Sequence, residues 1–134
     1  MADILTEVHA MLAADATLIA EVPATRIESV QATQNTARPN IVLRQPNSRE
    51  RWGAFGGDDG LHRPVVEVDV YSSVSPLQAH TIGELVRAVL QRKGPVTQVS
   101  SEVTDITIED ESLDYDDDER VFVKHYEMLA TIRE

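Results

Sequence analysis

Histidines and carboxylates are the side chains of this 134-residue sequence that could carry out chemistry, because the chain contains no cysteine. The four histidines are His9, His62, His80 and His125. They form no HExxH motif and no pair at i, i+4 that would mark a metal site on a helix. The absence of cysteine also excludes disulfides and thiolate metal sites. We therefore expect structural or solvent-facing roles for the histidines and no metal ion.

The densest group of carboxylates lies between Glu109 and Glu119, where eight of eleven residues are Asp or Glu. This run lacks the central glycine and the terminal glutamate spacing of an EF-hand calcium loop. A solvated turn between two strands is therefore expected. Because the carboxylates repel one another, they must be hydrated, bound to cations or directed toward a water-filled space.

The motifs of nucleophilic catalysis and of nucleotide binding are missing. The sequence contains no GxSxG elbow, no GxxxxGK[ST] loop and no GxGxxG turn. A glycine-rich segment at residues 55–60 lacks the following helix that would direct backbone amides at a phosphate. We predict a protein that is not an enzyme, with no catalytic residues and no cofactor.

The amino-acid composition narrows the class of protein further. The net charge of −11 argues against a surface that grips nucleic acid, because phosphate contacts need clustered Lys and Arg. The hydrophobic content of 42% and charged content of 26% are typical of a globular protein, and no apolar run approaches the roughly 20 residues that cross a bilayer. Acidic residues near the N-terminus do not resemble a signal peptide. We expect a single domain, residues 1–134, in a reducing cytoplasm.

Helices and strands must position these side chains, and the clearest sequence signal for one of them is the strand predicted at residues 65–71. Val66, Val68 and Val70 alternate with polar residues, which is typical of a half-buried strand. A helix is predicted to follow, with Ser75 as its N-cap and Gln78 completing a capping box. Its apolar stripe, which includes Leu77 and Leu85, runs to about Lys93, where Gly94 and Pro95 end the helix.

The rest of the chain predicts a helix at residues 3–13, a short capped turn after Asp15, and strands at 26–30, 40–44, 103–108 and 121–132. The order α-β-β-β-α-β-β predicts an α+β fold, with a mixed, mainly antiparallel sheet and two helices packed on one face. The other face carries Glu67, Asp69 and Tyr71 with either Val121, Val123 and Leu129 or Phe122, Tyr126 and Met128. We expect this partly apolar face to be covered by another molecule.

This pattern of elements resembles the small tail completion, or tail terminator, proteins of long-tailed bacteriophages and related phage-like particles. The residues that carry the resemblance are Ile4–Ala16, Arg26–Ile27, Pro39–Leu43, Val66–Tyr71, Leu85–Leu90 and Tyr115–Phe122. The resemblance extends over nearly the whole chain. It rests on a pattern of elements and not on a catalytic motif.

The resemblance implies a virion structural protein that forms a ring, commonly a hexamer, on the end of the tail tube and joins the tail to the head. Its partners would be further copies, the tail tube protein and head–tail connector proteins, with DNA passing through without specific binding. It would be made in the host bacterial cytoplasm. Two alternatives stay open: another neck or tail component, such as a head-completion adaptor or tube subunit, and an unrelated small enzyme or binding module.

A ring subunit needs an exposed patch that fits a different patch on its neighbour. Arg49, Arg51, Trp52 and Phe55 have the composition of such a contact, because arginine and aromatic anchors are enriched at interface cores. We predict that they contact a neighbouring subunit or the tail tube. The alternative is a loop folded over its own core, with Trp52 filling a gap.

The acidic run gives a second set of candidate site residues: Asp114, Asp116, Asp117 and Asp118. On the inner radius of a ring they would make the channel negative, so that DNA slides through without adhering. On the outer radius they would only keep the particle soluble. The sequence leaves both positions open.

Overall fold

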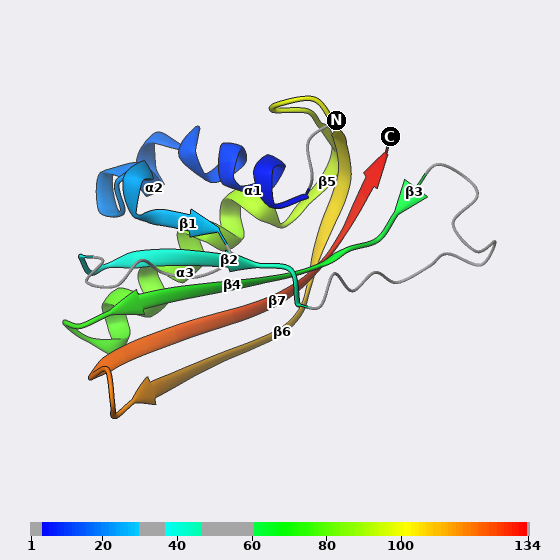
Figure 1. Cartoon of the computed structure of the whole chain (residues 1–134). Coiled ribbons are helices and arrows are strands. Elements are labelled where there is room, and N and C mark those ends of the chain that lie inside the picture. The colour runs from blue at the N-terminus through cyan, green and yellow to red at the C-terminus, as the bar shows by residue number, and fades with distance from the viewer. Residues whose placement is uncertain (1–3, 30–36, 47–60, 134) are drawn as a thin grey trace.

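One twisted sheet organises the computed structural model, which describes residues 4–29, 37–46 and 61–133 (Figure 1). Its strands follow the order β1-β2-β4-β7-β6-β5, and β3 pairs with β7 outside this path. The elements are α1 (Ile4–Ala13), α2 (Ala16–Glu21), η1 (Ala24–Arg26), β1 (Ile27–Ser29), β2 (Asn40–Arg44), β3 (Leu61–His62), β4 (Val65–Ser72), α3 (Pro76–Leu90), β5 (Arg92–Val96), β6 (Glu102–Asp116) and β7 (Val121–Arg133). The pairing of β1 with β2 is parallel and the others are antiparallel. This confirms the predicted α+β fold with a mixed, mainly antiparallel sheet.

The helices cover one face of the sheet, and the core lies between them (Figure 1). Val66, Val68 and Val70 of β4 are buried on this face, as their alternation predicted. From α3, Ile82 and Val86 are also buried in the same cluster. The predicted stripe was wrong at its start: Leu77 is 71% exposed, because the buried face of α3 begins at Ala79 and Leu77 lies off that face.

The start of α3 follows its sequence signals with one exception. Ser75 Oγ accepts a hydrogen bond from the N–H of Gln78 at 3.0 Å, and Pro76 occupies the first turn. The Gln78 side chain does not complete the expected capping box, because its carbonyl accepts from the hydroxyl of Ser72 at 2.5 Å. Ser72 Oγ in turn accepts from the backbone N–H of Ser75 at 3.4 Å. A serine at the end of β4 thus links the strand to the helix cap.

The end of α3 differs from the prediction. The helix ends at Leu90, and β5 follows and pairs with β6, placing Arg92 opposite Ile106. Gly94 and Pro95 therefore lie within a strand, at a shift of register between Lys93 and Val96. Gly94 has a φ of 120°, which favours glycine, and a bulge tolerates a proline that has no N–H to give to the ladder.

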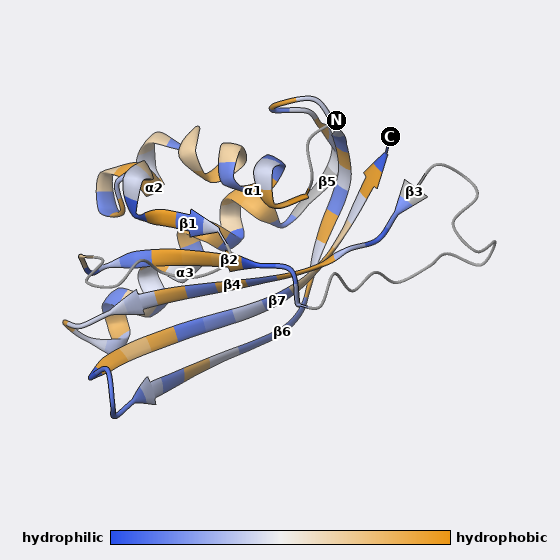
Figure 2. Ribbon diagram, viewed as in Figure 1, coloured by the Kyte–Doolittle hydropathy of each residue, from blue (hydrophilic) through white to orange (hydrophobic). Residues whose placement is uncertain are grey.

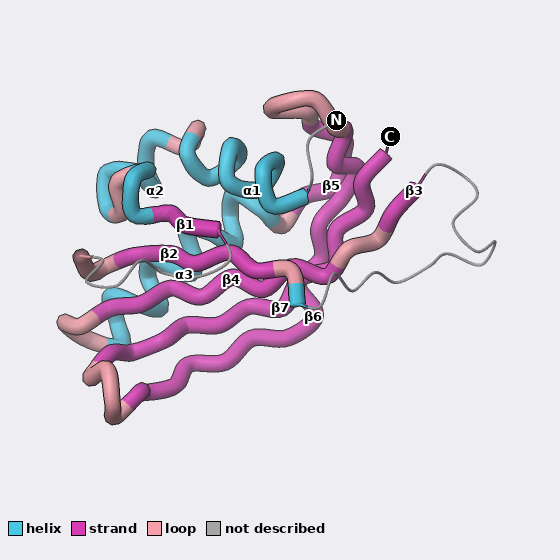
Figure 3. Tube along the Cα trace, viewed as in Figure 1, coloured by secondary structure: helices cyan, strands magenta, loops and turns pink. Residues whose placement is uncertain are grey.

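The acidic segment is mostly strand and not turn. Strand β6 continues through Asp116, which pairs with Val121, and only residues 117–120 turn back into β7. A continuous partner strand satisfies the backbone of β6, so its poor intrinsic strand propensity is overridden. Figure 2 shows hydrophilic residues along the outer half of β6, and Figure 3 shows β6 and β7 side by side through most of the sheet.

The other predicted helices and strands are present, but two strands were not predicted. The first helix is confirmed, and Asp15 Oδ1 caps α2 by accepting from the N–H of Leu18 at 2.9 Å. The predicted strands at 26–30 and 40–44 correspond to β1 and β2. The predicted order lacked β3 and β5. None of the helices in the described residues is long and apolar enough to cross a membrane.

The strand register decides which residues share the helix-free face. Val123 lies opposite Tyr71, and Leu129 lies opposite Val65. The first of the two predicted sets, Val121, Val123 and Leu129, is therefore the one that accompanies Glu67, Asp69 and Tyr71.

Candidate functional site

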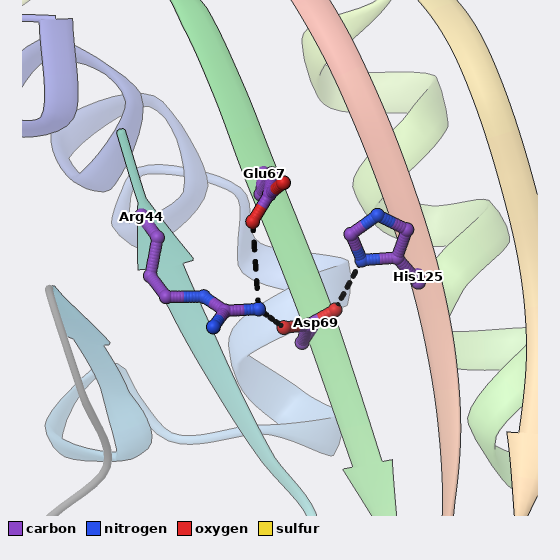
Figure 4. Close-up of polar contacts among 4 residues, drawn as sticks. All are labelled: Arg44, Glu67, Asp69 and His125. Atoms are coloured by element: carbon purple, nitrogen blue, oxygen red, sulfur yellow. Dashed lines mark hydrogen bonds and ion pairs between the residues drawn. The ribbon is translucent and has the colours of Figure 1, made fainter. Parts of the chain in front are cut away.

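A cluster of four charged or titratable side chains lies on the helix-free face (Figure 4). Its members come from three adjacent strands: Arg44 from β2, Glu67 and Asp69 from β4, and His125 from β7. Arg44 is opposite Glu67 in register, and Asp69 is opposite His125. The cluster is therefore a product of sheet pairing between residues that are far apart in sequence.

Asp69 is the centre of this cluster and is only 3% exposed. One carboxylate oxygen, Oδ2, accepts a hydrogen bond from Nη2 of Arg44. The other, Oδ1, lies 2.5 Å from Nδ1 of His125. The same Arg44 nitrogen is 3.5 Å from Oε2 of Glu67. A buried carboxylate is costly without such partners, so these contacts compensate for the burial of Asp69.

The electrostatics follow from this arrangement. The hydrogen bond to Asp69 raises the pKa of His125 above its ordinary value of 6.5, although burial opposes that shift. The negative charge of Glu67 raises the pKa of His125 further, and the positive charge of Arg44 lowers it. Burial, together with the charge of Asp69, raises the pKa of Tyr71. The cluster can therefore hold a proton on His125, but it brings together no nucleophile and base.

An open hollow of about 680 Å³ adjoins the cluster on the same face. Asp69 and His125 form one wall, and Val123 lies between them and the β6–β7 turn. The structure also brings all four candidate aspartates to this hollow: Asp114, Asp116, Asp117 and Asp118. Asp114 and Asp116 come from β6, whereas Asp117 and Asp118 belong to the turn.

The turn is held by hydrogen bonds from its backbone to the side chain of Asp116. Asp116 Oδ1 accepts from the N–H groups of Asp118 at 3.0 Å and Glu119 at 3.1 Å. Arg120 has a φ of 56°, which completes the reversal into β7. Within the described ranges, no group of three or more His, Asp or Glu side chains could hold a metal ion.

The same hairpin also carries exposed apolar side chains. Leu113 is 42% exposed and Tyr115 is 49% exposed. The ring of Tyr115 lies 4.9 Å from that of Phe122, centroid to centroid. The end of the hairpin therefore combines exposed carboxylates with exposed apolar side chains.

The remaining candidate residues are the predicted contact residues and the histidines. Arg49, Arg51, Trp52 and Phe55 lie outside the described residues. Among the histidines, His80 is exposed, as expected. His9 has a structural role, because its Nε2 lies 2.9 Å from the carbonyl oxygen of Ile27.

Two buried carboxylates were missed from the sequence, Asp69 and Glu7. Glu7 in α1 is fully buried and accepts from backbone N–H groups of the segment before β6, namely Gln98 at 3.0 Å, Val99 at 3.1 Å, Ser100 at 3.1 Å and Ser101 at 3.4 Å. The signal for Asp69 was a charged residue between two core valines. Glu7 gave a weaker signal, a glutamate beside the apolar stripe of α1.

Two comparisons with known proteins find matches over nearly the whole chain. A family model described as "Tail completion protein gp17" matches residues 6–132. No curated protein sequence matches this chain. Among solved structures, a chain of the "Virion of native gene transfer agent (GTA) particle" has a TM-score of 0.76 at 14% sequence identity, covering 98% of this chain and 95% of that chain. At this identity the structural likeness shows a shared fold.

Proposed function

The chain belongs to the tail completion protein gp17 family, and from that membership we propose that it is a ring-forming structural protein of a phage-like virion. The ring would terminate the tail tube and join the tail to the head or its connector. The observation that carries the proposal is the family match over residues 6–132, which include nearly all of the sheet and its helices. No enzymatic step is part of the proposal.

Ring assembly requires two different patches on each subunit, so that one copy contacts the next and the circle closes. The helix-free face supports this requirement, because its hollow and its polar cluster lie where no helix of the described residues covers the sheet. For the second patch we propose Arg49, Arg51, Trp52 and Phe55, whose composition suits an interface.

The proposed partners are further copies, six by resemblance, together with the tail tube protein and head–tail connector proteins. DNA would pass through the ring without specific binding. The net charge of −11 supports this, because like charge repels the phosphate backbone. The proposed location is the tail or neck of the virion, after synthesis in the host bacterial cytoplasm.

Negative-stain microscopy of the purified protein at high concentration, combined with light scattering, tests the function. We expect closed rings of uniform size that cap one end of isolated tail tubes. Extended tubes of stacked rings would instead identify a tube subunit, and binding to heads alone would identify a head-completion adaptor. A strict monomer that binds neither particle would contradict the proposal.

Deletion of residues 49–60 tests the proposed contact segment. We expect a folded monomer that no longer forms rings or terminates tails. Circular dichroism and thermal unfolding provide the control for folding. An unfolded deletion variant would show that the segment belongs to the core and would contradict its assignment as a contact.

A further inference from the structure

We propose that the outer edge of β6, from Asp110 to Asp116, is a docking site for an extended segment of a partner protein in which basic and apolar side chains alternate. The segment would add one strand to the sheet. This assignment goes beyond the ring function proposed above and does not depend on it, because it needs only the sheet of a single chain. It follows from the pairing of β6, from the side chains along its edge and from their charge.

Strand β6 is paired on both sides only over its first part. Between Val103 and Ile106 it lies between β7 and β5. From Asp110 to Asp116 it pairs with β7 in unbroken register, and no strand of the described ranges pairs with its other side. Figure 1 shows this half of β6 as the outermost strand of the sheet. Every second residue of an edge strand directs its backbone N–H and C=O away from the sheet, so this edge can pair with another chain.

The edge is long enough for one complete strand. Its seven residues span about 23 Å at roughly 3.3 Å per residue. None of these residues is buried. By contrast, Val103 and Ile106, in the part of β6 that β5 covers, are both buried. Within the described part of the chain, this half of β6 is therefore open to a partner over the length of an ordinary strand.

Apolar and acidic side chains alternate along this edge. Leu113 and Tyr115 are large apolar residues that are exposed, and Asp114 and Asp116 alternate with them. In a pair of strands, each side chain lies beside the side chain directly opposite it. An added strand would therefore place every second side chain beside an apolar residue and the others beside a carboxylate. A segment in which apolar residues alternate with Lys or Arg satisfies both kinds of neighbour.

The charge of the edge argues for a basic partner and against a second copy of this chain. Asp114 and Asp116 form no ion pair with any residue that the structure describes, whereas Glu111 is paired with Arg87 and Lys124. Two copies of the edge would place carboxylates opposite carboxylates, which is destabilising. The edge strand at the other end of the sheet, β1, offers only three residues with a glutamate in the middle. The acidic edge therefore resists pairing between copies and admits a cationic strand.

Peptide binding tests the site with the full chain. The probe is a fluorescent peptide of alternating lysine and valine, as long as the edge, and fluorescence anisotropy at low salt measures its affinity. We expect a dissociation constant below about 1 mM. Two control peptides have the same charge: one groups the lysines and the valines in separate blocks, and the other is methylated on every backbone nitrogen. Each should bind about tenfold more weakly or not at all, because strand addition needs both the alternation and the backbone N–H groups.

Amide hydrogen exchange locates the bound peptide. Binding should slow exchange about tenfold or more at alternate residues between Asp110 and Asp116, and leave the part of β6 between Val103 and Ile106 unchanged, because β5 already covers that part. Protection elsewhere in the chain without protection of the outer edge would overturn the proposal. Equal affinity for all three peptides would also overturn it, because it would show attraction between charges without strand pairing.

Variants of the edge separate its apolar and acidic contributions. Leu113→Thr with Tyr115→Thr removes the apolar neighbours and keeps residues that favour strands. Asp114→Asn with Asp116→Asn removes the charges and keeps Oδ1 of residue 116 as an acceptor for the turn. We expect each double variant to weaken binding of the alternating peptide by about tenfold. Unchanged affinity in both double variants would contradict the site.

Matched controls make the same changes away from the edge. Val99→Thr alters a residue that is 53% exposed in the segment before β6, and Asp105→Asn with Glu21→Gln removes two exposed charges. Both controls should bind the peptide as the unchanged chain does. Thermal unfolding checks the fold of each variant, and the three peptides test the unchanged chain without any substitution. A monomer that binds the alternating peptide would contradict the ring and support the docking site, whereas rings that do not bind it would do the reverse.

Discussion

Nδ1 of His125 lies 2.5 Å from Oδ1 of Asp69, directly across the pairing of β7 with β4. Arg44 from β2 binds the other oxygen of the same carboxylate. Asp69 is therefore held by two basic groups from the strands on either side of its own. This arrangement makes the helix-free face sensitive to the protonation of one histidine, and the hollow lies against that histidine.

The stability of the protein should therefore depend on pH near neutrality. The bond to Asp69 raises the pKa of His125 above 6.5, so its stabilising effect is complete below about pH 6.5 and is lost as the pH rises through the folded-state pKa. We expect the free energy of unfolding in urea to fall as the pH rises above about 6.5. His125→Gln should remove most of this slope.

His80→Gln is the matched control, because His80 is an exposed histidine in α3. This variant should keep the slope of the unchanged chain. An identical pH dependence in His125→Gln and the unchanged chain would show that the contact between His125 and Asp69 does not contribute to folding.

Three leucines of α3 offer a graded test of how the helix packs. Leu90 is fully buried, Leu85 is partly buried against the core, and Leu77 is 71% exposed. Leu90→Ala should reduce the free energy of unfolding by about 2–5 kcal/mol. Leu77→Ala should change it by less than about 0.5 kcal/mol, with Leu85→Ala between the two. Equal effects at the three positions, measured by urea unfolding, would contradict this packing.

The sequence predicted those elements whose signals are local. The alternation of Val66, Val68 and Val70 and the Ser75 cap depend on residues within a few positions of one another, and both are confirmed. The full length of β6 could not be predicted, because its acidic half is ordered by pairing with β7 and not by its own propensity. The strand containing Gly94 was missed for the same reason.

The candidate site was predictable only in part. Charge density alone identified Asp114 and Asp116 as candidates. The register of three strands, β4, β7 and β6, then determined that they adjoin Asp69 and His125, and no local pattern contains that register. Buried charges are hard to anticipate for the same reason: the partners of Glu7 lie more than 90 residues further along the chain.

Glu7 gives the next prediction. Burial alone would raise the pKa of its carboxyl group, but the backbone N–H groups of Gln98, Ser100, Val99 and Ser101 outweigh that effect and lower the pKa below 4.5. Glu7→Gln should cost about 2–4 kcal/mol at pH 7, because an amide oxygen accepts fewer and weaker bonds from these groups.

The pH dependence of this variant follows from the direction of the shift. The contribution of Glu7 is present above about pH 4.5 and is lost as the pH falls through the lower folded-state pKa. The difference between Glu7→Gln and the unchanged chain should therefore shrink in acid. Glu21→Gln, at an exposed position of α2, is the control and should have little effect. A stability difference that does not vary with pH would contradict this account.

Gly83 should not tolerate a side chain. A Cβ atom at this position would lie 2.7 Å from Cγ of Lys124 and 2.8 Å from the hydroxyl oxygen of Tyr126. Gly83→Ala should therefore destabilise the protein by about 1–3 kcal/mol, although alanine is the better helix former by about 1 kcal/mol. Adding Tyr126→Phe removes one of the two close contacts, so the loss should be smaller in that background. A more stable Gly83→Ala variant would show that α3 lies further from β7.

The last prediction concerns Asp117 and Asp118, the exposed residues of the β6–β7 turn, in the proposed ring. We expect the double change Asp117→Asn and Asp118→Asn to leave ring size unchanged and to slow DNA delivery by assembled particles, because a negative channel keeps DNA from adhering to its wall. The defect should be largest near 10 mM salt, where the screening length is about 30 Å, and small near 150 mM, where it is about 8 Å. Asp105→Asn with Asp110→Asn removes the same charge elsewhere on β6 and should leave delivery unchanged. Full delivery by the turn variant at low salt would place the turn on the outer surface of the ring, where its charge serves only solubility.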